Sequence, residues 1–255
     1  MLLEQTTTRD AEAAFEDVEV AVFPVASTEQ HGPALPLNTD TMAAETVARG
    51  VAERHDTVVL PTLPIGISPH HRQFYGTTWV SDGTFQDFVR ETLEHFTIHG
   101  VTKMVLVNGH GGNSGAISQV AKDLYRADTA FVVPWSWWKG VGDLPTELLG
   151  DEINVPGHAA NFEASMMMHL APELVREDRF KGVTQSEPKE SRFDHPDARG
   201  FDIIDRTDIG VSGSLDRASA EAGKAFCEAS QEALDGLVEW LVELSPAECA
   251  PISHK

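Results

Sequence analysis

Cysteine is nearly absent from this chain of 255 residues, which contains only Cys227 and Cys249. Two thiols near one end of a chain of this length do not form a disulfide framework, and their spacing is not that of a zinc site. Cys227 lies in a helical pattern and is predicted to be a small buried side chain. Cysteine is therefore excluded as a metal ligand.

Basic side chains are also scarce, because 19 Lys and Arg stand against 40 Asp and Glu and give a net charge of −21. Such a surface repels nucleic-acid phosphates and anionic membranes, so neither is expected as a partner. One interpretation is an ordinary solvated acidic surface. The other, which we favour, is halophilic adaptation to a high-salt cytoplasm, where salt screens the repulsion between dense carboxylates.

Long apolar runs are missing as well. No stretch of 18 or more apolar residues occurs, which argues against a transmembrane helix. Residues 1–17 are acidic and lack the basic and apolar regions of a signal peptide, so a cytoplasmic location is expected. The hydrophobic content of 41% is ordinary for a globular protein with a core. The length fits one α/β domain spanning residues 1–255.

Short Val-rich segments alternate with amphipathic segments along the chain. Apolar strands separated by helices are typical of a parallel sheet that is covered on both faces. The predicted fold class is therefore α/β, a three-layer α/β/α domain with a mainly parallel sheet. Thr39 is the expected N-cap of the first helix, and residues 181–215 are predicted to form a long irregular connection. The predicted strands span residues 18–25, 57–60, 103–107 and 129–135, and the predicted helices span 40–54, 84–99, 116–126, 162–170 and 218–244.

Ligands of open α/β sheets bind beyond the carboxyl ends of the strands. The loops that follow the first three strands, residues 26–40, 61–81 and 108–113, are therefore expected to converge on one site. The first loop contains Glu29 and His31 and leads to Asp40. These side chains are suitable ligands for Zn, Mn or Fe(II).

Two further segments carry groups of the same kind. His110 stands among three glycines directly after the third strand, and glycine suits a backbone that must approach a metal or substrate closely. His158 precedes a predicted helix, and Glu163 lies in the first turn of that helix. Each residue alone has an ordinary alternative as a surface group or a helix cap. The hypothesis of a metal site depends on their convergence.

Other catalytic motifs fit this chain poorly. The glycine turn around His110 could form a tight turn or hold a phosphate, but it lacks the Lys-Ser/Thr of a P-loop and the G-x-G-x-x-G of a dinucleotide fold. No G-x-S-x-G elbow is present, which argues against a serine hydrolase. The sequence therefore favours metal-assisted hydrolysis over phosphate binding or a serine nucleophile.

The chain resembles the creatininase (creatinine amidohydrolase) family from about residue 18 to residue 177, and again over residues 210–226. The motifs that carry the resemblance are STEQHGP followed by NTD, then VNGHGGN, GHAANFEAS and GVSGSLDRASAEAGKAF. In this order they are highly specific. The resemblance implies a single α/β/α domain, two divalent metal ions per subunit and a homo-oligomer, which is often a hexamer in this family.

The resemblance also implies roles for individual residues. Glu29, His31, Asp40 and His110 match the family's metal ligands, with Asp40 as the bridge between the two ions. Some members place a fifth ligand, a glutamate, where this chain has Gly112. Members with the NGHGGN form resemble this chain in offering Glu163, which is expected either to bind a metal or to support the residues that do. His158 matches the family's acid–base histidine and is assigned with Glu163 to catalysis.

The substrate implied by the resemblance is a small molecule with an amide bond, attacked by metal-activated water. Family members include creatinine hydrolases, a formylaminopyrimidine ribonucleotide deformylase of riboflavin and deazaflavin synthesis, and a peptidase of mycofactocin maturation. We favour the deformylase, because His70 and Arg72 offer cationic groups for a substrate phosphate. The alternative for Arg72 is an ion pair with a carboxylate. A non-catalytic metal-binding or scaffold protein is the alternative from another class.

Four more residues are candidates for substrate binding. Trp135 and Trp137 could stack on a planar ring, or they could belong to the core or to a subunit interface. The backbone N–H groups of Gly111 and Gly112 could assist an oxyanion.

Overall fold

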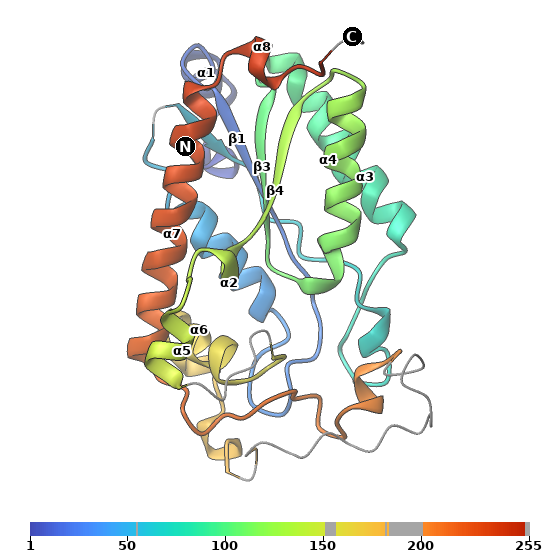
Figure 1. Cartoon of the computed structure of the whole chain (residues 1–255), viewed down its shortest axis with the longest axis vertical. Helices are drawn as coiled ribbons and strands as arrows, with labels where there is room; N and C mark the ends of the chain where they lie inside the picture. Colours follow the sequence, from blue (N-terminus) through green and yellow to red (C-terminus); the bar gives the residue numbers. More distant parts are fainter. Residues whose placement is uncertain (55, 151–156, 182, 184–200, 253–255) are drawn as a thin grey trace.

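Four parallel strands form one sheet in the order β2-β1-β3-β4 (Figure 1). The computed structural model describes residues 1–54, 56–150, 157–181, 183 and 201–252. The central strands β1 and β3 pair along their full length, with Val20 opposite Lys103 and Val25 opposite Asn108. The predicted α/β fold with a parallel sheet is confirmed. The strands are β1 (Val20–Val25), β2 (Thr57–Val59), β3 (Lys103–Asn108) and β4 (Phe131–Ser136).

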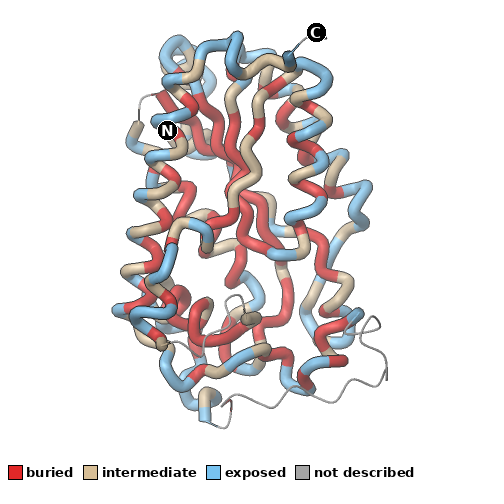
Figure 2. The backbone as a smooth tube through the Cα atoms, in the orientation of Figure 1, coloured by how far each residue is buried: buried red, intermediate tan, exposed pale blue. Residues whose placement is uncertain are grey.

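Helices cover both faces of this sheet, so that three layers are seen in Figure 1. Along β1, Val20 and Val22 pack into the cluster formed with α2 and α7, whereas Ala21 and Phe23 pack into the cluster formed with α3 and α4. Both faces of the strand are buried, which explains why its sequence reads as a continuous apolar run. The buried centre is visible in Figure 2. These helices are α2 (Thr39–Arg49), α3 (Asp82–Phe96), α4 (Ser114–Arg126) and α7 (Ala220–Glu243).

The strand order places the switch point of the sheet at the carboxyl ends of β1 and β3. From β1 the chain passes through α2 to β2 on one side, and then through α3 to β3 on the other side of β1. The loops after β1 and β3 therefore leave in opposite directions, which opens the position where doubly wound sheets bind ligands. Helix α6 (Asn161–Leu170) lies beyond this end of the sheet (Figure 1).

Several boundaries differ from those expected. Asn38 precedes α2, so the prediction of Thr39 as the N-cap is wrong. Thr39 is the first helical residue, and its hydroxyl donates to the Pro36 carbonyl at 2.8 Å. The three helices without a predicted counterpart are short: α1 (Thr8–Ala14), α5 (Leu144–Leu149) and α8 (Pro246–Cys249).

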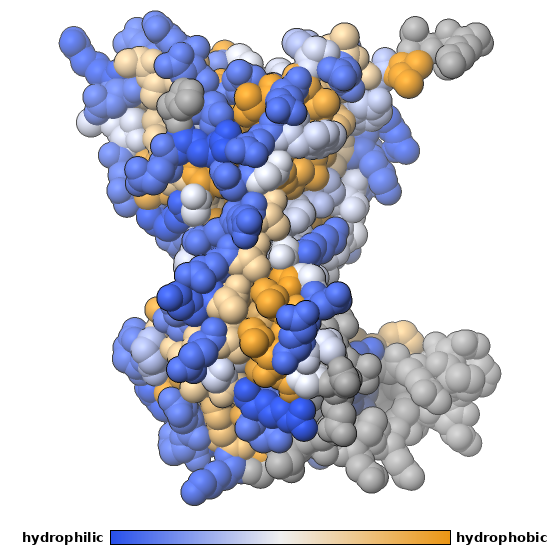
Figure 3. All heavy atoms as spheres, turned by 60° about the vertical axis from the view of Figure 1, so that its left-hand side comes forward, coloured by the Kyte–Doolittle hydropathy of each residue, from blue (hydrophilic) through white to orange (hydrophobic). Residues whose placement is uncertain are grey.

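Most of the predicted irregular segment 181–215 falls on residues 182 and 184–200, which lie outside the described residues. Its described part contains one 3-10 turn, Ile203–Asp205, and a bridge between His158 and Ser212. No helix in the described ranges is long and apolar enough to cross a membrane. Hydrophilic side chains cover much of the face shown in Figure 3.

Phe226 is the side chain that most directly ties α7 to α6, because it is fully buried and its ring centroid lies 4.9 Å from that of Phe162. We expect Phe226→Ala to lower the free energy of unfolding by about 3–5 kcal/mol, the usual cost of removing a buried aromatic ring. Urea denaturation would measure this loss. The matched control is Phe88→Ala, since Phe88 is 53% exposed. Equal effects of the two variants would contradict the packing described here.

Candidate metal centre

Glu29 and His31 follow β1 in the first loop, and both are buried. Gly32 adopts a φ of +63°, a conformation that glycine tolerates, and this turns the chain back towards α2. The Nδ1 atom of His31 lies 3.2 Å from the Glu29 carbonyl, which can only accept, so Nδ1 carries the proton. The other ring nitrogen, Nε2, is thereby directed at the carboxylate of Asp40.

Asp40 lies between two imidazoles. It occupies the first turn of α2, and its Oδ1 is 3.1 Å from His31 Nε2 while its Oδ2 is 3.2 Å from His110 Nδ1. A Cβ at Gly109 would contact the Asp40 carbonyl oxygen, so glycine at this position allows α2 to approach the end of β3. One carboxylate therefore contacts two imidazoles through different oxygens.

His110 completes this arrangement from the loop after β3. Its Nε2 donates to the Ile67 carbonyl at 3.0 Å, which orients Nδ1 towards Glu29 Oε2 and Asp40 Oδ2, each 3.2 Å away. Ser68, from the loop after β2, donates to Glu29 Oε2 at 2.5 Å. The three loops meet at one place, as the strand-end rule predicts.

Glu163 reaches the same cluster from α6. Its Oε2 lies 3.8 Å from His31 Nε2 and accepts a hydrogen bond from the Ala159 N–H at 2.5 Å. Three sets of side chains place one ligand atom each within 4.8 Å of one another, the distance range needed to share a cation. These sets are His31 with Asp40 and Glu163, Glu29 with His31 and His158, and Glu29 with His70 and His110.

Burial penalises the charges of Glu29, His31 and His110, yet opposite charges beside these three groups outweigh that penalty. Burial alone would raise the pKa of Glu29, but the neighbouring histidines, His110 first, hold it well below its ordinary value. Burial alone would lower the pKa of His110, but Glu29 and Asp40 raise it to about 10. The pKa of His31 is raised in the same way against burial by Asp40 and Glu163. The carboxylate of Glu29 therefore remains ionised and requires positive charge beside it.

Two buried atoms at the centre of this cluster suit a bound cation. Within the described residues, His31 Nε2 and Asp40 Oδ2 have no hydrogen-bond partner, although each lies close to an opposite charge. Buried polar atoms without a partner are rare and costly. Imidazole nitrogens and carboxylate oxygens are ligands that Zn, Mn and Fe(II) accept. The residues present therefore fit a divalent metal.

Gln30 and Ser68 are not among the residues that the sequence predicts for the site, yet both contact its members. Gln30 is buried, and its Nε2 lies 2.8 Å from His71 Nδ1 and 2.9 Å from His158 Nε2, while Ser68 contacts Glu29. Gln30 could have been predicted from its position, because it stands between two expected ligands in the sequence. Ser68 gives no comparable signal, because serine is common in loops.

The second loop carries less positive charge than the sequence suggests. Burial lowers the pKa of His70, and it lowers that of His71 to about 2, so both rings are neutral at neutral pH. Arg72 forms an ion pair with the buried carboxylate of Asp202 at 2.6 Å, the alternative to a substrate phosphate. Gln73 donates to the same oxygen of Asp202 at 2.6 Å.

The two candidate tryptophans lie against the core. Trp137 is 2% exposed and stacks on Phe162 with ring centroids 4.7 Å apart. Trp135 is half-buried against the same cluster, and its ring edge faces Gly140. This packing supports their interpretation as core residues.

Gly111 and Gly112 open the 3-10 turn before α4. A Cβ at Gly112 would contact both the Ile67 carbonyl oxygen and the ring of His110, so no larger residue fits there.

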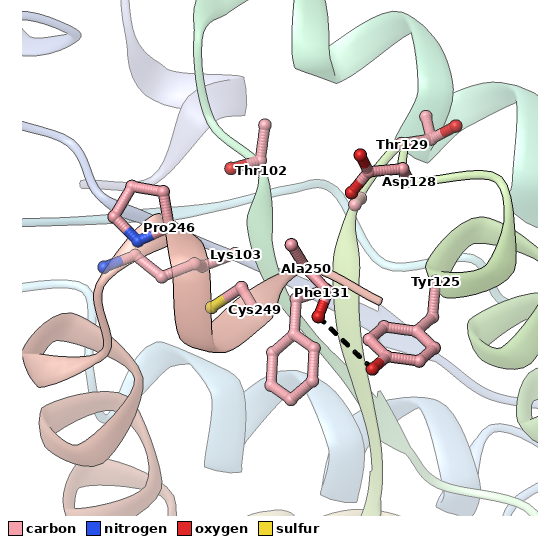
Figure 4. A pocket seen from close by; sticks show the side chains of 10 residues that line it. Thr102, Lys103, Tyr125, Asp128, Thr129, Phe131, Pro246, Cys249 and Ala250 are labelled. Carbon is pink, nitrogen blue, oxygen red and sulfur yellow. Dashed lines mark hydrogen bonds between the residues drawn. The ribbon is translucent and has the colours of Figure 1, made fainter. Parts of the chain in front are cut away.

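A separate pocket of about 230 Å³ lies at the amino ends of β3 and β4. Figure 4 shows its lining, where the Tyr125 hydroxyl donates to the Ala250 carbonyl. Lys103 and Asp128 are the charged residues of this lining, and it contains no histidine. The groups suited to metal chemistry therefore gather at the opposite end of the sheet.

A family model described as Creatininase: Creatinine amidohydrolase matches residues 4–240. The mycofactocin precursor peptide peptidase of Mycobacterium tuberculosis is 30% identical over 238 residues, which cover 86% of this chain and 85% of that protein. The creatinine amidohydrolase of Pseudomonas putida is 33% identical over 178 residues, which cover 63% of this chain and 67% of that protein.

Solved structures agree with these sequence relationships. The crystal structure of a creatinine amidohydrolase (creatininase) matches with a TM-score of 0.79 at 28% identity and covers 96% of this chain and 98% of that chain. Related creatininase structures are described as a Zn-Zn type and as an Mn form. Because the family model spans nearly the whole chain, this protein belongs to the creatininase family of metal-dependent amidohydrolases.

Proposed function

We propose that this protein hydrolyses a C–N amide bond of a small molecule with the help of two divalent cations per subunit. The proposal rests on one observation. Three carboxylates and two imidazoles lie close together, and within the described residues two of their atoms, His31 Nε2 and Asp40 Oδ2, have no hydrogen-bond partner. Loss of one of these groups would have favoured a non-catalytic binding protein. All five are present and buried or half-buried in one cluster.

The geometry supports a division of the five groups between two cations. Glu29 and His110 would hold one cation, and His31 and Glu163 would hold the other. Asp40 would bind both, since its two oxygens already face different imidazoles at 3.1 and 3.2 Å. Cations bound there would polarise the amide carbonyl and promote the ionisation of water.

His158 is the residue that we propose to move the proton in this reaction. Its Nδ1 lies 3.7 Å from Glu29 Oε1, and its ring centroid is 4.6 Å from that of His31. Burial, and then the charge of His31, lower the pKa of His158, so its neutral ring can accept a proton from water. The same ring can pass this proton to the departing nitrogen, a contribution of about 10²–10⁴ in rate.

A formylaminopyrimidine ribonucleotide is the substrate that would need Arg72 for its phosphate. The Arg72 side chain is 54% exposed beside the site, although Asp202 already neutralises it. His70 and His71 add no positive charge, because burial lowers the pKa of both. The named relatives support creatinine hydrolysis and peptide cleavage as the competing candidates.

A panel of amides would decide between these activities. Protein reconstituted with Zn²⁺ or Mn²⁺ is given creatinine, the formylaminopyrimidine ribonucleotide or a short peptide. Formate, creatine and the cleaved peptide are then measured. We expect hydrolysis of one of them, and a metal-dependent release of formate would establish the deformylase. Full metal content without turnover of any amide in the panel would favour the non-catalytic alternative.

Asp40→Ala should remove both cations and reduce turnover to background, because Asp40 contacts both imidazoles of the cluster. Metal content by mass spectrometry and kcat/KM on the active substrate measure the two effects. The matched control is Asp82→Ala, which removes an exposed aspartate from the first turn of another helix, α3. An active Asp40→Ala enzyme with normal metal content would rule out the proposed centre.

Glu163→Gln should lower the metal stoichiometry from two ions to one per subunit. The neutral amide keeps the shape of the side chain but is a weaker ligand than the carboxylate that faces His31. Glu173→Gln, at an exposed position after α6, is the control. Retention of two ions by Glu163→Gln would show that Glu163 only supports the ligands through its hydrogen bond with Ala159.

A further inference from the structure

Gln30 stands between the two histidines of the site that are not assigned to a metal. We propose that Gln30 is a positioning residue that holds His71 through its side-chain amide and His158 through its backbone carbonyl, each ring with the proton on Nε2, so that Nδ1 of His158 faces the reaction. The inference rests on the proposed amide hydrolysis for its kinetic consequence. The tautomers themselves can be measured without turnover.

The orientation of the Gln30 carboxamide follows from its oxygen. Oε1 accepts a hydrogen bond from the Gly32 N–H at 2.9 Å, and a backbone N–H can only donate. Nε2 must therefore point the other way. There it lies 2.8 Å from His71 Nδ1, 2.9 Å from His158 Nε2 and 3.1 Å from the Gly210 carbonyl oxygen.

The number of available protons then determines the tautomers of His71 and His158. The amide has two N–H bonds, and the Gly210 carbonyl can only accept one of them. His158 Nε2 also lies 2.8 Å from the Gln30 backbone carbonyl, which likewise only accepts, so His158 satisfies this contact by donating. The second amide N–H is left for His71 Nδ1. Each of these protons then has an acceptor, and Gln30 Nε2 and His158 Nε2, 2.9 Å apart, lie side by side as donors to different acceptors.

In the two assigned tautomers, His71 turns an N–H group and His158 turns a lone pair towards Glu29. A proton on His71 Nε2 faces Glu29 Oε1 at 3.5 Å, so His71 supports that carboxylate as a neutral donor. A proton on His158 Nε2 leaves Nδ1 with a free lone pair, 3.7 Å from the same oxygen. This lone pair can take the proton that water loses as it adds to the carbonyl carbon. It can return that proton to nitrogen as the C–N bond breaks.

The backbone around the Gln30 side chain fits closely against its amide group. Gln30 is 4% exposed, and Gly210, with a φ of +79°, presents its carbonyl to Nε2. A Cβ at Gly210 would collide with the Gln30 carboxamide, so only glycine allows the approach. A buried amide with this many fixed contacts is suited to setting the direction of neighbouring rings.

Nuclear magnetic resonance of the zinc-loaded protein with ¹⁵N-labelled histidine reads the tautomers directly. Signals are assigned by their loss in His71→Gln and His158→Gln. We expect both rings in the Nε2–H form in the wild type. In Gln30→Glu the carboxylate has no proton to donate, so His71 should change to the Nδ1–H form. An Nδ1–H form of either ring in the wild-type protein would overturn the proposal.

Kinetics supply the second readout. Gln30→Glu and Gln30→Met should lower kcat about 10²-fold, with KM changed by less than about threefold, because they release His71, whose ring packs against the acid–base His158 with centroids 4.5 Å apart. Metal content should remain at the wild-type value. Gln119→Glu, the same chemical change at an exposed position of α4, should behave as wild type.

The outcomes separate this inference from the proposed function. Wild-type kcat in Gln30→Met, or a His71 tautomer unchanged in Gln30→Glu, would refute the role of Gln30 and leave the hydrolase intact. Absence of turnover in the wild type would refute the hydrolase, and the resonance measurement would still decide the tautomers.

Discussion

The burial of three carboxylates in one small space is the constraint on which the site depends. Glu29, Asp40 and Glu163 come from three separate segments and would repel one another without positive charge between them. The protein places imidazoles among them, and the raised pKa values of His31 and His110 show how strongly this cluster attracts cations. Divalent metals satisfy the same demand with more charge. The surrounding architecture holds these like charges together.

The sheet supplies the rigid frame for that cluster. Strands β1 and β3 are neighbours, and their last residues Val25 and Asn108 are paired. Glu29 and His110, which follow these strands, therefore lie at the same end of the sheet. Helix α2 follows β1 and adds Asp40, and the glycine after Asn108 lets that helix come close. Apolar packing on both faces fixes these elements, so the polar groups lose little further freedom when they bind a ligand.

The sequence predicts the repeating parts of this protein better than its individual contacts. Apolar runs located all four strands, and the strand-end rule brought Glu29 and His110 together, because both depend on local pattern and general topology. The contacts of Gln30 with Gly210 and of Arg72 with Asp202 join residues more than a hundred positions apart. Such long-range pairings produce no periodic pattern in the sequence, so they could not be predicted from local segments.

The space around Gly112 supports the proposal that Glu163 of α6 supplies the fifth ligand. Backbone and ring atoms already fill the space that a side chain at Gly112 would need. A glutamate substituted at Gly112 could not bind a metal unless the segment that contains Ile67 also moved away. In this chain a carboxylate at residue 112 therefore cannot replace the one at residue 163 without a coupled change in the loop that contains Ile67.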